Sequence, residues 1–481
     1  MAKKKSEAVE DISALLEFNS ADFVDAVDSD SRLVAQEIGL DDLDTCISSG
    51  ILAYDLILGG GRKSGRWYSE TGPEHGGKTT LVKMALGQGM LHIPSQLTGI
   101  YIDQEGTLDP TWAGHIWGVQ PSELYTVFGQ RKAGGKQWQH PPRIRYYKPQ
   151  FGEQALLFLI NLLSRRPEKV KAEGQWWYIY TPMPADEVRK NGTGYTLAEL
   201  RDKLTVNKRK LWDANLYSHT GLFYVPVPNN YGGPELIIGV DSWSAFTPKQ
   251  IALQDNDALG SQARMFSRYL NTLKSLAASR GVTIVGTKQI RQKIGGYGDP
   301  EYNPGGENLK HVDDVRCRIG TLSNKVKSGK SNSNVQVEDT DEYRYFKIRN
   351  KKNKTFVPFK ECDGRWWTSH EGSSGFGIDP VFDTMEYLRM TGQYEAQKRG
   401  FRAVLIDDTK AAKKLLDIVF NYQSFKDSIL NHCIYNSEGS KVASFDLRNY
   451  CFKQIKKDDG LGLRLFLQGG AIQDEEDDEE E

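Results

Sequence analysis

The stretch "GPEHGGKTTL", residues 72–81, decides the fold. It follows a short apolar run that alternates like a strand, and it leads into "VKMALGQGML", which has helical spacing. Gly72, Gly77, Lys78 and Thr79 satisfy the pattern G-x-x-x-x-G-K-[ST] at this strand-to-helix junction. Glycines let backbone N–H groups turn inward around phosphate oxygens, and the helix N-terminus adds its positive dipole end. We therefore expect a phosphate-binding loop.

Each side chain of the loop has an expected task. Lys78 supplies a mobile positive charge to the β- and γ-phosphates, and the Thr79 hydroxyl is a ligand for Mg²⁺. The expected cofactors are ATP and Mg²⁺. The residues of the loop expected to hold the nucleotide are Gly72, Pro73, Glu74, His75, Gly76, Gly77, Lys78, Thr79 and Thr80.

Four apolar, β-rich segments alternate with helical stretches through the first two thirds of the chain. This rhythm predicts an α/β fold with a mostly parallel sheet covered by helices on both faces. A hairpin-like pair, 343–351 and 356–364, is expected at one edge of the sheet. The four candidate strands are 65–70, 97–105, 235–242 and 281–289.

Acidic residues end two of these candidate strands. Asp241 follows "LIIGV", where a carboxylate would reach the Mg²⁺ water shell, and is a second candidate metal ligand. Glu105 follows "IYIDQ" and could orient a hydrolytic water. Acids at strand ends are also common turn and capping residues, so the spacing alone leaves both alternatives open.

The composition is that of an ordinary globular protein, with 38% hydrophobic and 26% charged residues. The longest apolar run, 155–163, is too short to cross a bilayer, and the basic first residues precede no apolar segment. We therefore expect a cytoplasmic protein that does not enter the membrane. Its five cysteines are scattered without the paired spacing of a zinc site.

Changes in pattern along the chain suggest an organisation in domains. A core at 46–370 is interrupted at about 129–149 and 165–233 by stretches rich in aromatic, basic, Gly and Pro residues. We interpret these as insertions at core loops, which either bind duplex DNA or a partner or only elaborate the surface. The remaining expected parts are an N-terminal polymerisation arm at 1–45, a small C-terminal α+β domain at 371–473 and an acidic tail at 474–481.

The tail "DEEDDEEE" hides a basic body. Without it, 62 basic residues face 55 acidic ones, a net charge of +7 instead of −1. A basic body with an acidic tail is typical of a polyanion binder that carries its own competitor, although a tail that only aids solubility has the same composition.

The segment 290–310 combines basic residues, glycines, prolines and tyrosines. Such a loop suits single-stranded DNA, where cations follow phosphates and rings stack on bases, but a plain flexible loop is the alternative. The candidates for DNA contact are Arg291, Lys293, Tyr297, Gly305, Gly306 and Lys310, with Arg264 from a second loop at 252–264.

Taken in order, the motifs resemble the RecA family of bacterial and phage recombinases over about half the chain. They include "ISSGILAYDLILGGG", "YIDQEGTLDP", "VDSWSAFTPK", "KQIRQKIG", "PGGENLK" and "NKTFVPFK" around the phosphate loop. The resemblance implies a RecA-like P-loop ATPase core that polymerises on single-stranded DNA and pairs it with a homologous duplex. Its partners would be these two DNA forms, further copies of the chain in a helical filament, and single-strand-binding or loading proteins.

The resemblance also implies roles for single residues. Glu105 falls on the catalytic glutamate, and Gln289 on the glutamine that senses the γ-phosphate and adjoins the DNA loop. Asp109 and Trp112 match positions beside the adenine base. Lys352 and Lys354 match lysines that reach the neighbouring subunit's ATP.

Some positions depart from the family pattern. Lys288 stands where the family usually has asparagine, and the two insertions are foreign to the common bacterial form. Such divergence is typical of a phage-encoded relative. Ring-shaped helicases share this core fold, and a non-catalytic DNA-binding mediator could retain it, so both remain alternatives to a recombinase.

Overall fold

The computed structural model describes most of the core and parts of the remaining chain. The expected arm at 1–45 and the acidic tail lie outside the described residues. The described ranges are 46–132, 137–172, 174–180, 216–217, 222–253, 260–292, 301–302, 305–321, 343–367, 377–398, 400–405, 418–456 and 461–467.

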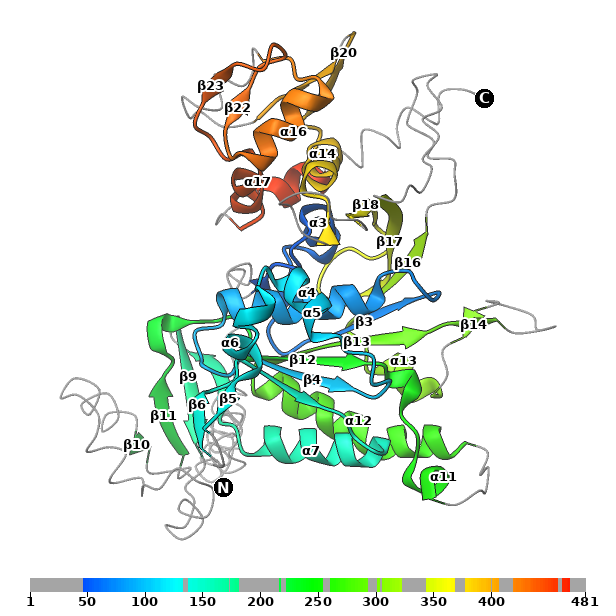
Figure 1. Cartoon of the computed structure of the whole chain (residues 1–481). Helices are drawn as coiled ribbons and strands as arrows, with labels where there is room; N and C mark the ends of the chain where they lie inside the picture. The colour runs from blue at the N-terminus through cyan, green and yellow to red at the C-terminus, as the bar shows by residue number, and fades with distance from the viewer. Residues whose placement is uncertain are drawn as a thin grey trace, which may run out of the picture. The chain divides into compact units, whose positions relative to one another are not determined.

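A nine-stranded sheet forms the centre of the core (Figure 1). Six of its strands coincide with the four segments and the hairpin expected from the sequence, whereas those at Ile144–Tyr147, Val315–Thr321 and Gly377–Ile378 were not expected. The strands are β3 (Trp67–Gly72), β4 (Gly99–Asp103), β7 (Ile144–Tyr147), β12 (Leu236–Asp241), β13 (Val282–Gln289), β16 (Val315–Thr321), β17 (Tyr343–Asn353), β18 (Glu361–Trp367) and β19 (Gly377–Ile378).

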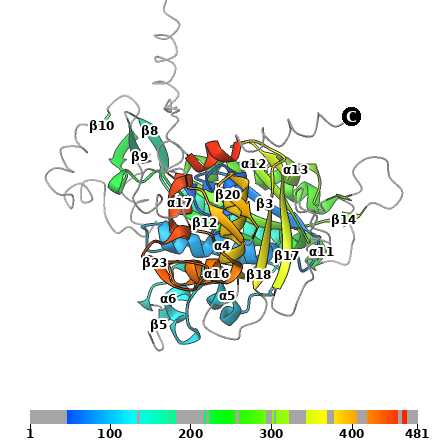
Figure 2. The same cartoon turned by 90° about the horizontal axis from the view of Figure 1, so that it is seen from above.

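The sheet is mixed, with a parallel part and an antiparallel part. Its order is β19-β18-β17-β16-β3-β13-β12-β4-β7, and all pairs from β16 to β7 are parallel. The hairpin β17–β18 continues the sheet antiparallel on the β16 side, and the two strands run side by side in both views (Figure 2). A mostly parallel α/β sheet fits the expected RecA-like core.

Helices cover both faces of the sheet, because adjacent residues of each buried strand point to opposite sides. Ile237 belongs to the buried cluster that contains the side chains of α3 and α4, whereas its neighbour Ile238 belongs to the cluster that contains those of α7 and α12. The helices of the core are α3 (Leu52–Leu58), α4 (Lys78–His92), α5 (Pro110–Trp117), α6 (Tyr125–Phe128), α7 (Gly152–Ser164), α11 (Lys249–Leu253), α12 (Ser261–Ser279) and α13 (Glu307–His311).

The register of the parallel strands brings their ends level with one another. Asp103 pairs with Asp241, and Gln289 pairs with Gly72. The residues that follow β3, β4, β12 and β13 therefore meet at one edge, which is the usual place for a ligand in such sheets.

The stretch 129–149, interpreted from the sequence as an insertion, contains part of this sheet. Ile144–Tyr147 forms β7, which pairs parallel with β4. A short antiparallel pair precedes it, β5 (Gln130–Arg131) with β6 (Trp138–His140). The edge strand was not predicted because its composition is basic and aromatic. Of its four residues only Ile144 is buried, while Arg145 and Tyr146 are exposed, so the strand has no continuous apolar pattern.

Residues 165–231 belong to a compact unit distinct from the core. Their described part is a four-stranded antiparallel sheet in the order β10-β11-β9-β8. Lys169 is buried and lies over the rings of Trp176 and Tyr231. The strands are β8 (Glu168–Ala172), β9 (Gln175–Tyr180), β10 (Leu216–Tyr217) and β11 (Leu222–Pro226).

The C-terminal region combines helices with short hairpins around a cluster of Phe401, Phe420 and Phe425. The pattern "LRLFLQ" at 463–468 predicts a short strand, but the chain is helical over 461–467, so this prediction was wrong. The other elements are α14 (Pro380–Met390), β20 (Tyr394–Gln397), β21 (Gly400–Ala403), α16 (Tyr422–Leu430), β22 (Ile434–Tyr435), β23 (Lys441–Ala443) and α17 (Leu447–Lys456).

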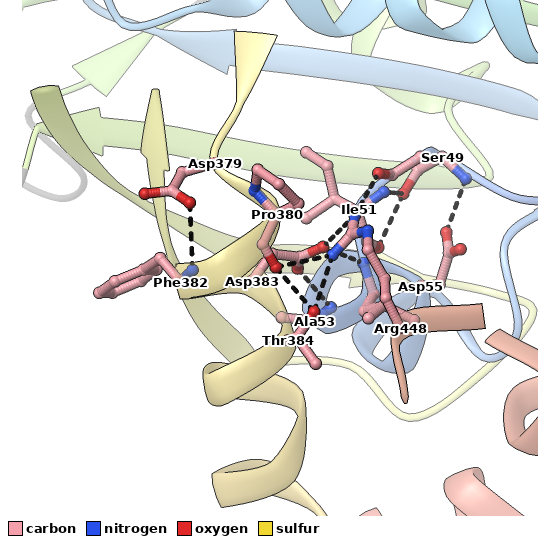
Figure 3. A network of polar contacts seen from close by, with 12 residues as sticks. Ser49, Ile51, Ala53, Asp55, Asp379, Pro380, Phe382, Asp383, Thr384 and Arg448 are labelled. Carbon is pink, nitrogen blue, oxygen red and sulfur yellow. Dashed lines mark hydrogen bonds and ion pairs between the residues drawn. The ribbon is translucent and has the colours of Figure 1, made fainter. Parts of the chain in front are cut away.

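A buried polar network joins this region to the start of the core (Figure 3). Helix α3 follows Ile51, whose side chain cannot cap it. Asp383 of α14 takes this task, accepting hydrogen bonds from the N–H groups of Leu52 at 2.9 Å and Ala53 at 3.1 Å. Arg448 of α17 pairs with Asp383 at 2.8 Å and donates to the Gly50 carbonyl. The network satisfies helix-end groups that would otherwise be buried without partners.

Candidate nucleotide site

The loop between β3 and α4 has the geometry of a phosphate-binding loop. Gly77 adopts a φ of 90° directly before Lys78, the first residue of α4. A Cβ atom on Gly72 would lie 2.2 Å from the carbonyl oxygen of Ile319, and one on Gly77 would lie 2.8 Å from Trp366 Nε1. Glycine is therefore required at both motif positions by conformation and by space.

The Lys78 ammonium lies against its own loop. It donates to the carbonyl oxygens of Gly72 at 2.9 Å and Pro73 at 2.5 Å. Burial lowers the pKa of Lys78, whereas the charges of Asp241 and Glu105 oppose that shift. The cation therefore belongs to the same electrostatic site as the two strand-end carboxylates.

Hydroxyl groups on both neighbouring strands fix the carboxylate of Asp241. Its Oδ1 accepts from Thr287 Oγ1 at 2.7 Å, and its Oδ2 accepts from the Tyr101 hydroxyl at 3.1 Å. Burial and the charge of Asp241 raise the pKa of Tyr101, so this hydroxyl stays protonated and remains a donor. Asp241 is only 2% exposed, and its orientation is set before any ligand arrives.

The donor set fits Mg²⁺ held together with a nucleotide. Among the described residues there is no group of three or more His, Cys, Asp and Glu side chains that could hold a metal ion by itself. Mg²⁺ in nucleotide sites usually takes one or two protein ligands and completes its shell with water and phosphate oxygens. Thr79 and Asp241 are sufficient for that arrangement.

Glu105 brings the ends of three strands together. Its Oε1 accepts a hydrogen bond from Ser242 Oγ at 2.5 Å and lies 3.4 Å from Gln289 Nε2. The backbone N–H of Gln289 donates to Ser244 Oγ at 3.0 Å. The candidate base and the candidate sensor, 184 positions apart in sequence, are thus direct neighbours.

The turn after β4 presents an aromatic ring to the site. The fully buried carboxylate of Asp103 accepts from the N–H groups of Gly106 at 2.7 Å and Leu108 at 2.9 Å. Asp109 then caps α5 by accepting from the Trp112 N–H at 2.8 Å. Trp112 is 36% exposed. In this chain, the described role of Asp109 is to hold the helix that carries Trp112.

A pocket of about 360 Å³ lies over the phosphate loop. It is lined by Trp112, which the resemblance places beside the adenine base, and by three residues that sequence reasoning missed: Arg344, Trp366 and Trp367. The two consecutive tryptophans that end the hairpin were the sequence feature that could have indicated this. The pocket is lined by His75, Gly76, Gly77, Lys78, Thr79, Thr80, Trp112, Arg344, Trp366, Trp367 and Gly377.

Sequence reasoning also missed the hydroxyl groups that orient the carboxylates. Thr287 lies two residues before Gln289, and Tyr101 two residues before Asp103. Residues two apart on a strand share a face, so the period of the strands was a usable signal. Ser242 directly follows Asp241. Its contact with Glu105 was not predicted, because a serine after a strand is too common to indicate a particular role.

Lys352 and Lys354 do not line the pocket over the phosphate loop. Lys352 Nζ lies 3.3 Å from the carbonyl oxygen of Lys310, and the backbone N–H of Lys354 donates to the Asp314 carbonyl. Burial lowers the pKa of Lys352. Within one chain, these lysines therefore lie beside the C-terminal end of the expected DNA loop and the residues that follow it.

The expected DNA-contacting residues are only partly described. Lys293 and Tyr297 lie outside the described residues, and of Arg291 the structure gives the backbone pairing with Tyr302. Lys310 forms an exposed ion pair with Glu307 at 2.7 Å. Arg264 of α12 lines a second hollow of about 830 Å³, together with Lys249 and Arg268.

Gly305 and Gly306 have a packing role in addition to the one expected. Their φ angles are 105° and 83°, and a Cβ atom would lie 2.8 Å from Phe266 or from Ala263. Both neighbours belong to α12. The glycines therefore let the base of the loop lie directly on this helix.

Comparison with known proteins connects this site to a family. The RecA N-terminal domain family matches residues 230–367. Protein RecA of Thermus thermophilus is 26% identical over 355 residues, which cover 73% of each chain. Protein RecA of Deinococcus radiodurans is 28% identical over 66% of this chain and 61% of its own length. DNA repair protein recA homolog 1, chloroplastic, of Arabidopsis thaliana is 26% identical over 73% of this chain and 59% of its own.

These similarities, with the mostly parallel sheet and the phosphate loop, support the RecA family and a RecA-like ATPase at family level. Among the residues that the structure describes, no helix combines the length and apolar composition needed to cross a membrane.

Proposed function

We propose that the protein is an ATP-dependent recombinase. In this proposal it binds single-stranded DNA, assembles into helical filaments on it, and promotes homologous pairing and strand exchange during recombination and repair. The family-level similarity supports the class of protein, and the residues of the site support the activity.

One observation carries the proposal. Ser242 and Gln289 both donate hydrogen bonds to the carboxylate of Glu105, at three adjacent strand ends beside the phosphate loop. The chain continues from Gln289 into the basic segment expected to contact DNA. A site built for hydrolysis is therefore connected through a single side chain to a candidate DNA-binding element.

The residues divide the hydrolytic step among them. The loop and Lys78 bind and orient the phosphates, and Trp112 offers an apolar face to the base. Glu105 orients the attacking water and accepts its proton as a general base. The hydrogen bond from Ser242 holds the Glu105 carboxylate in position for this step. When bound by Thr79 and Asp241, Mg²⁺ would neutralise charge on the phosphate oxygens.

Lys352 and Lys354 complete the site from a neighbouring copy in this proposal. They are not among the residues that line the pocket in their own chain, and charge that develops on phosphate needs nearby cations, so action across an interface is favoured. Hydrolysis then depends on assembly, and assembly on DNA.

The test is electron microscopy of the purified protein on circular single-stranded DNA, with Mg²⁺ and a slowly hydrolysed ATP analogue. Continuous helical filaments that vanish when nucleotide is omitted are the expected result. A strand-exchange assay with a homologous linear duplex, and with a heterologous one as the control, tests the pairing activity directly.

Other outcomes would favour the two alternatives. Closed rings would favour a hexameric helicase or motor. Filaments with ATP turnover no higher than that of a Lys78→Ala variant would favour a non-catalytic DNA-binding mediator.

A further inference from the structure

The last residue before Gln289 is a buried lysine. Lys288 lies on β13 and is 0% exposed. Its Nζ atom lies 2.6 Å from Asp313 Oδ1 and donates to the Leu309 carbonyl oxygen at 2.5 Å. Both partners belong to the short segment that begins at Gly305, which contains the C-terminal end of the expected DNA loop at 290–310 and the residues directly after it.

Asp313 extends the contact to a third element. Its Oδ1 also accepts from Ser69 Oγ at 2.7 Å, and Ser69 lies on β3, the strand that leads into the phosphate loop. Asp313 is 0% exposed, and its Oδ2 has no hydrogen-bond partner among the described residues. The carboxylate is thus oriented entirely by contacts through one oxygen, with Lys288 supplying the only ion pair that the structure gives it.

A buried ion pair of this kind contributes little net stability to the fold. Removing two charges from water costs several kcal/mol, and well-packed apolar residues of similar size are often equally stabilising. What an ion pair with two defined hydrogen bonds adds is a fixed geometry. Here that geometry links the strand of the candidate sensor to the C-terminal end of the expected DNA loop and the residues directly after it.

We propose that Lys288 is a positioning residue that makes the segment Leu309–Asp313 follow the strand end that carries Gln289. A change in the position of Gln289 on nucleotide binding then moves the base of the loop, and DNA bound to the loop acts back on Gln289 through the same contact. This inference rests on the proposed function and adds a specific physical connection to it.

The structure contains a matched control pair. Lys274 of α12 donates to the Val312 carbonyl oxygen at 2.5 Å and pairs with Asp314 Oδ1 at 2.8 Å. It therefore fastens the end of the same segment by the same chemistry to α12, a helix that carries no residue of the nucleotide site. Asp314 Oδ2 also accepts from the Trp67 N–H of β3 at 3.0 Å, as Asp313 accepts from Ser69 of that strand, so the two pairs differ in that only Lys288 lies on β13.

The first experiment measures ATP turnover with and without single-stranded DNA in two double variants. Lys288→Met with Asp313→Asn removes the buried pair without leaving an unpaired charge, and Lys274→Met with Asp314→Asn is the control. For the Lys288 pair, we expect DNA-free turnover and melting temperature near those of the unmodified protein, with stimulation by DNA reduced about tenfold or more. The control pair should keep its stimulation.

A second measurement needs no variant. Burial lowers the pKa of Lys288 to about 8; Asp313 opposes this shift, and Arg316 and Lys352 reinforce it. We therefore expect stimulation by DNA to fall between pH 7 and 9.5. In the unfolded chain this lysine titrates near its ordinary value of about 10.4, so the folded state binds fewer protons over that range. The titration of Lys288 itself thus favours folding as the pH rises, and unfolding at this group would not explain the loss.

The outcomes separate the inference from the function it rests on. Unchanged stimulation in the Lys288 pair, or equal loss of stimulated and DNA-free turnover, would overturn the positioning role while leaving the recombinase in place. An unmodified protein whose turnover ignores DNA would overturn both. If the double variant does not fold, stimulation that stays constant from pH 7 to 9.5 overturns the inference by itself.

Discussion

Ser242 Oγ donates a hydrogen bond of 2.5 Å to the carboxylate of Glu105, and this contact joins the end of β12 to the end of β4. Since Ser242 directly follows Asp241, the residue that fixes the candidate base is chain neighbour to the candidate metal ligand. The two carboxylates therefore keep a defined spacing even though their strands are distant in sequence.

Replacing Glu105 with Gln should separate binding from hydrolysis. We expect turnover to fall by about 10²- to 10⁴-fold, because a general base contributes on that scale, while ATP affinity changes little. Turnover is measured under saturating ATP, and affinity from the change in intrinsic tryptophan fluorescence when ATP is added, since three tryptophans line the pocket. The control Ser242→Ala keeps the Glu105 carboxylate but removes the hydrogen bond that positions it, and should lower turnover much less. A Glu105→Gln protein with normal turnover would remove Glu105 from the mechanism.

Mixing two inactive variants should restore activity if the site is shared between subunits. Lys352→Ala removes the cation that a subunit supplies to its neighbour's ATP, and Glu105→Gln removes the general base from a subunit's own ATP site. In filaments of an equal mixture, about one quarter of the head-to-tail interfaces combine an intact Glu105 with an intact Lys352. We expect turnover to recover to roughly that fraction. Each variant alone is the control, and a mixture as inactive as its components would contradict a shared site.

Glu386 should make the stability of the C-terminal region depend on pH. Burial, with the charge of Asp363, raises the pKa of this carboxyl to about 7. Between pH 4.5 and 7 the folded state holds a proton that the unfolded chain has lost, so stability falls as the pH rises through this window. Glu386→Gln should therefore stabilise by about 2 kcal/mol at pH 8, after allowance for partial exposure, and by nothing at pH 4. Thermal unfolding at the two pH values tests this; an equal gain at both would contradict it.

Deletion of residues 474–481 should strengthen binding to duplex DNA. We hypothesise that "DEEDDEEE" competes with DNA for basic surface, so its removal should raise duplex affinity and steepen the dependence on salt concentration. Fluorescence anisotropy over a range of salt concentrations gives both quantities. Replacing the eight acids with Gln, at unchanged length, is the matched control. Equal affinity and equal salt slope in the deleted protein would contradict the hypothesis.

The fold was predictable where a sequence pattern has only one structural explanation. Buried strands such as β12 consist of apolar residues because both of their faces are covered, and the loop after β3 follows from its glycines and lysine. Strand β7 was missed because an edge strand carries exposed polar side chains, and its arginine and tyrosines indicated a loop.

The site was predictable at positions that carry a charge with a known task. Glu105 lies against Gln289, and the charges of Asp241 and Glu105 act on Lys78, while the roles of these residues stay predictions. Arg344, Trp366 and Trp367 come from a hairpin whose approach to the phosphate loop is decided by the order of strands in the sheet. No local pattern encodes that order, so their presence in the pocket required the structure.

The cap that Asp383 places on α3 crosses 331 positions of the chain, and Arg448 holds the same carboxylate. A chain made from its N-terminus has α3 long before either partner exists, although domains commonly begin to fold during synthesis. The first helix of the described core therefore cannot reach its final set of hydrogen bonds until the ribosome has passed residue 448. Its completion is a late event in the life of each molecule.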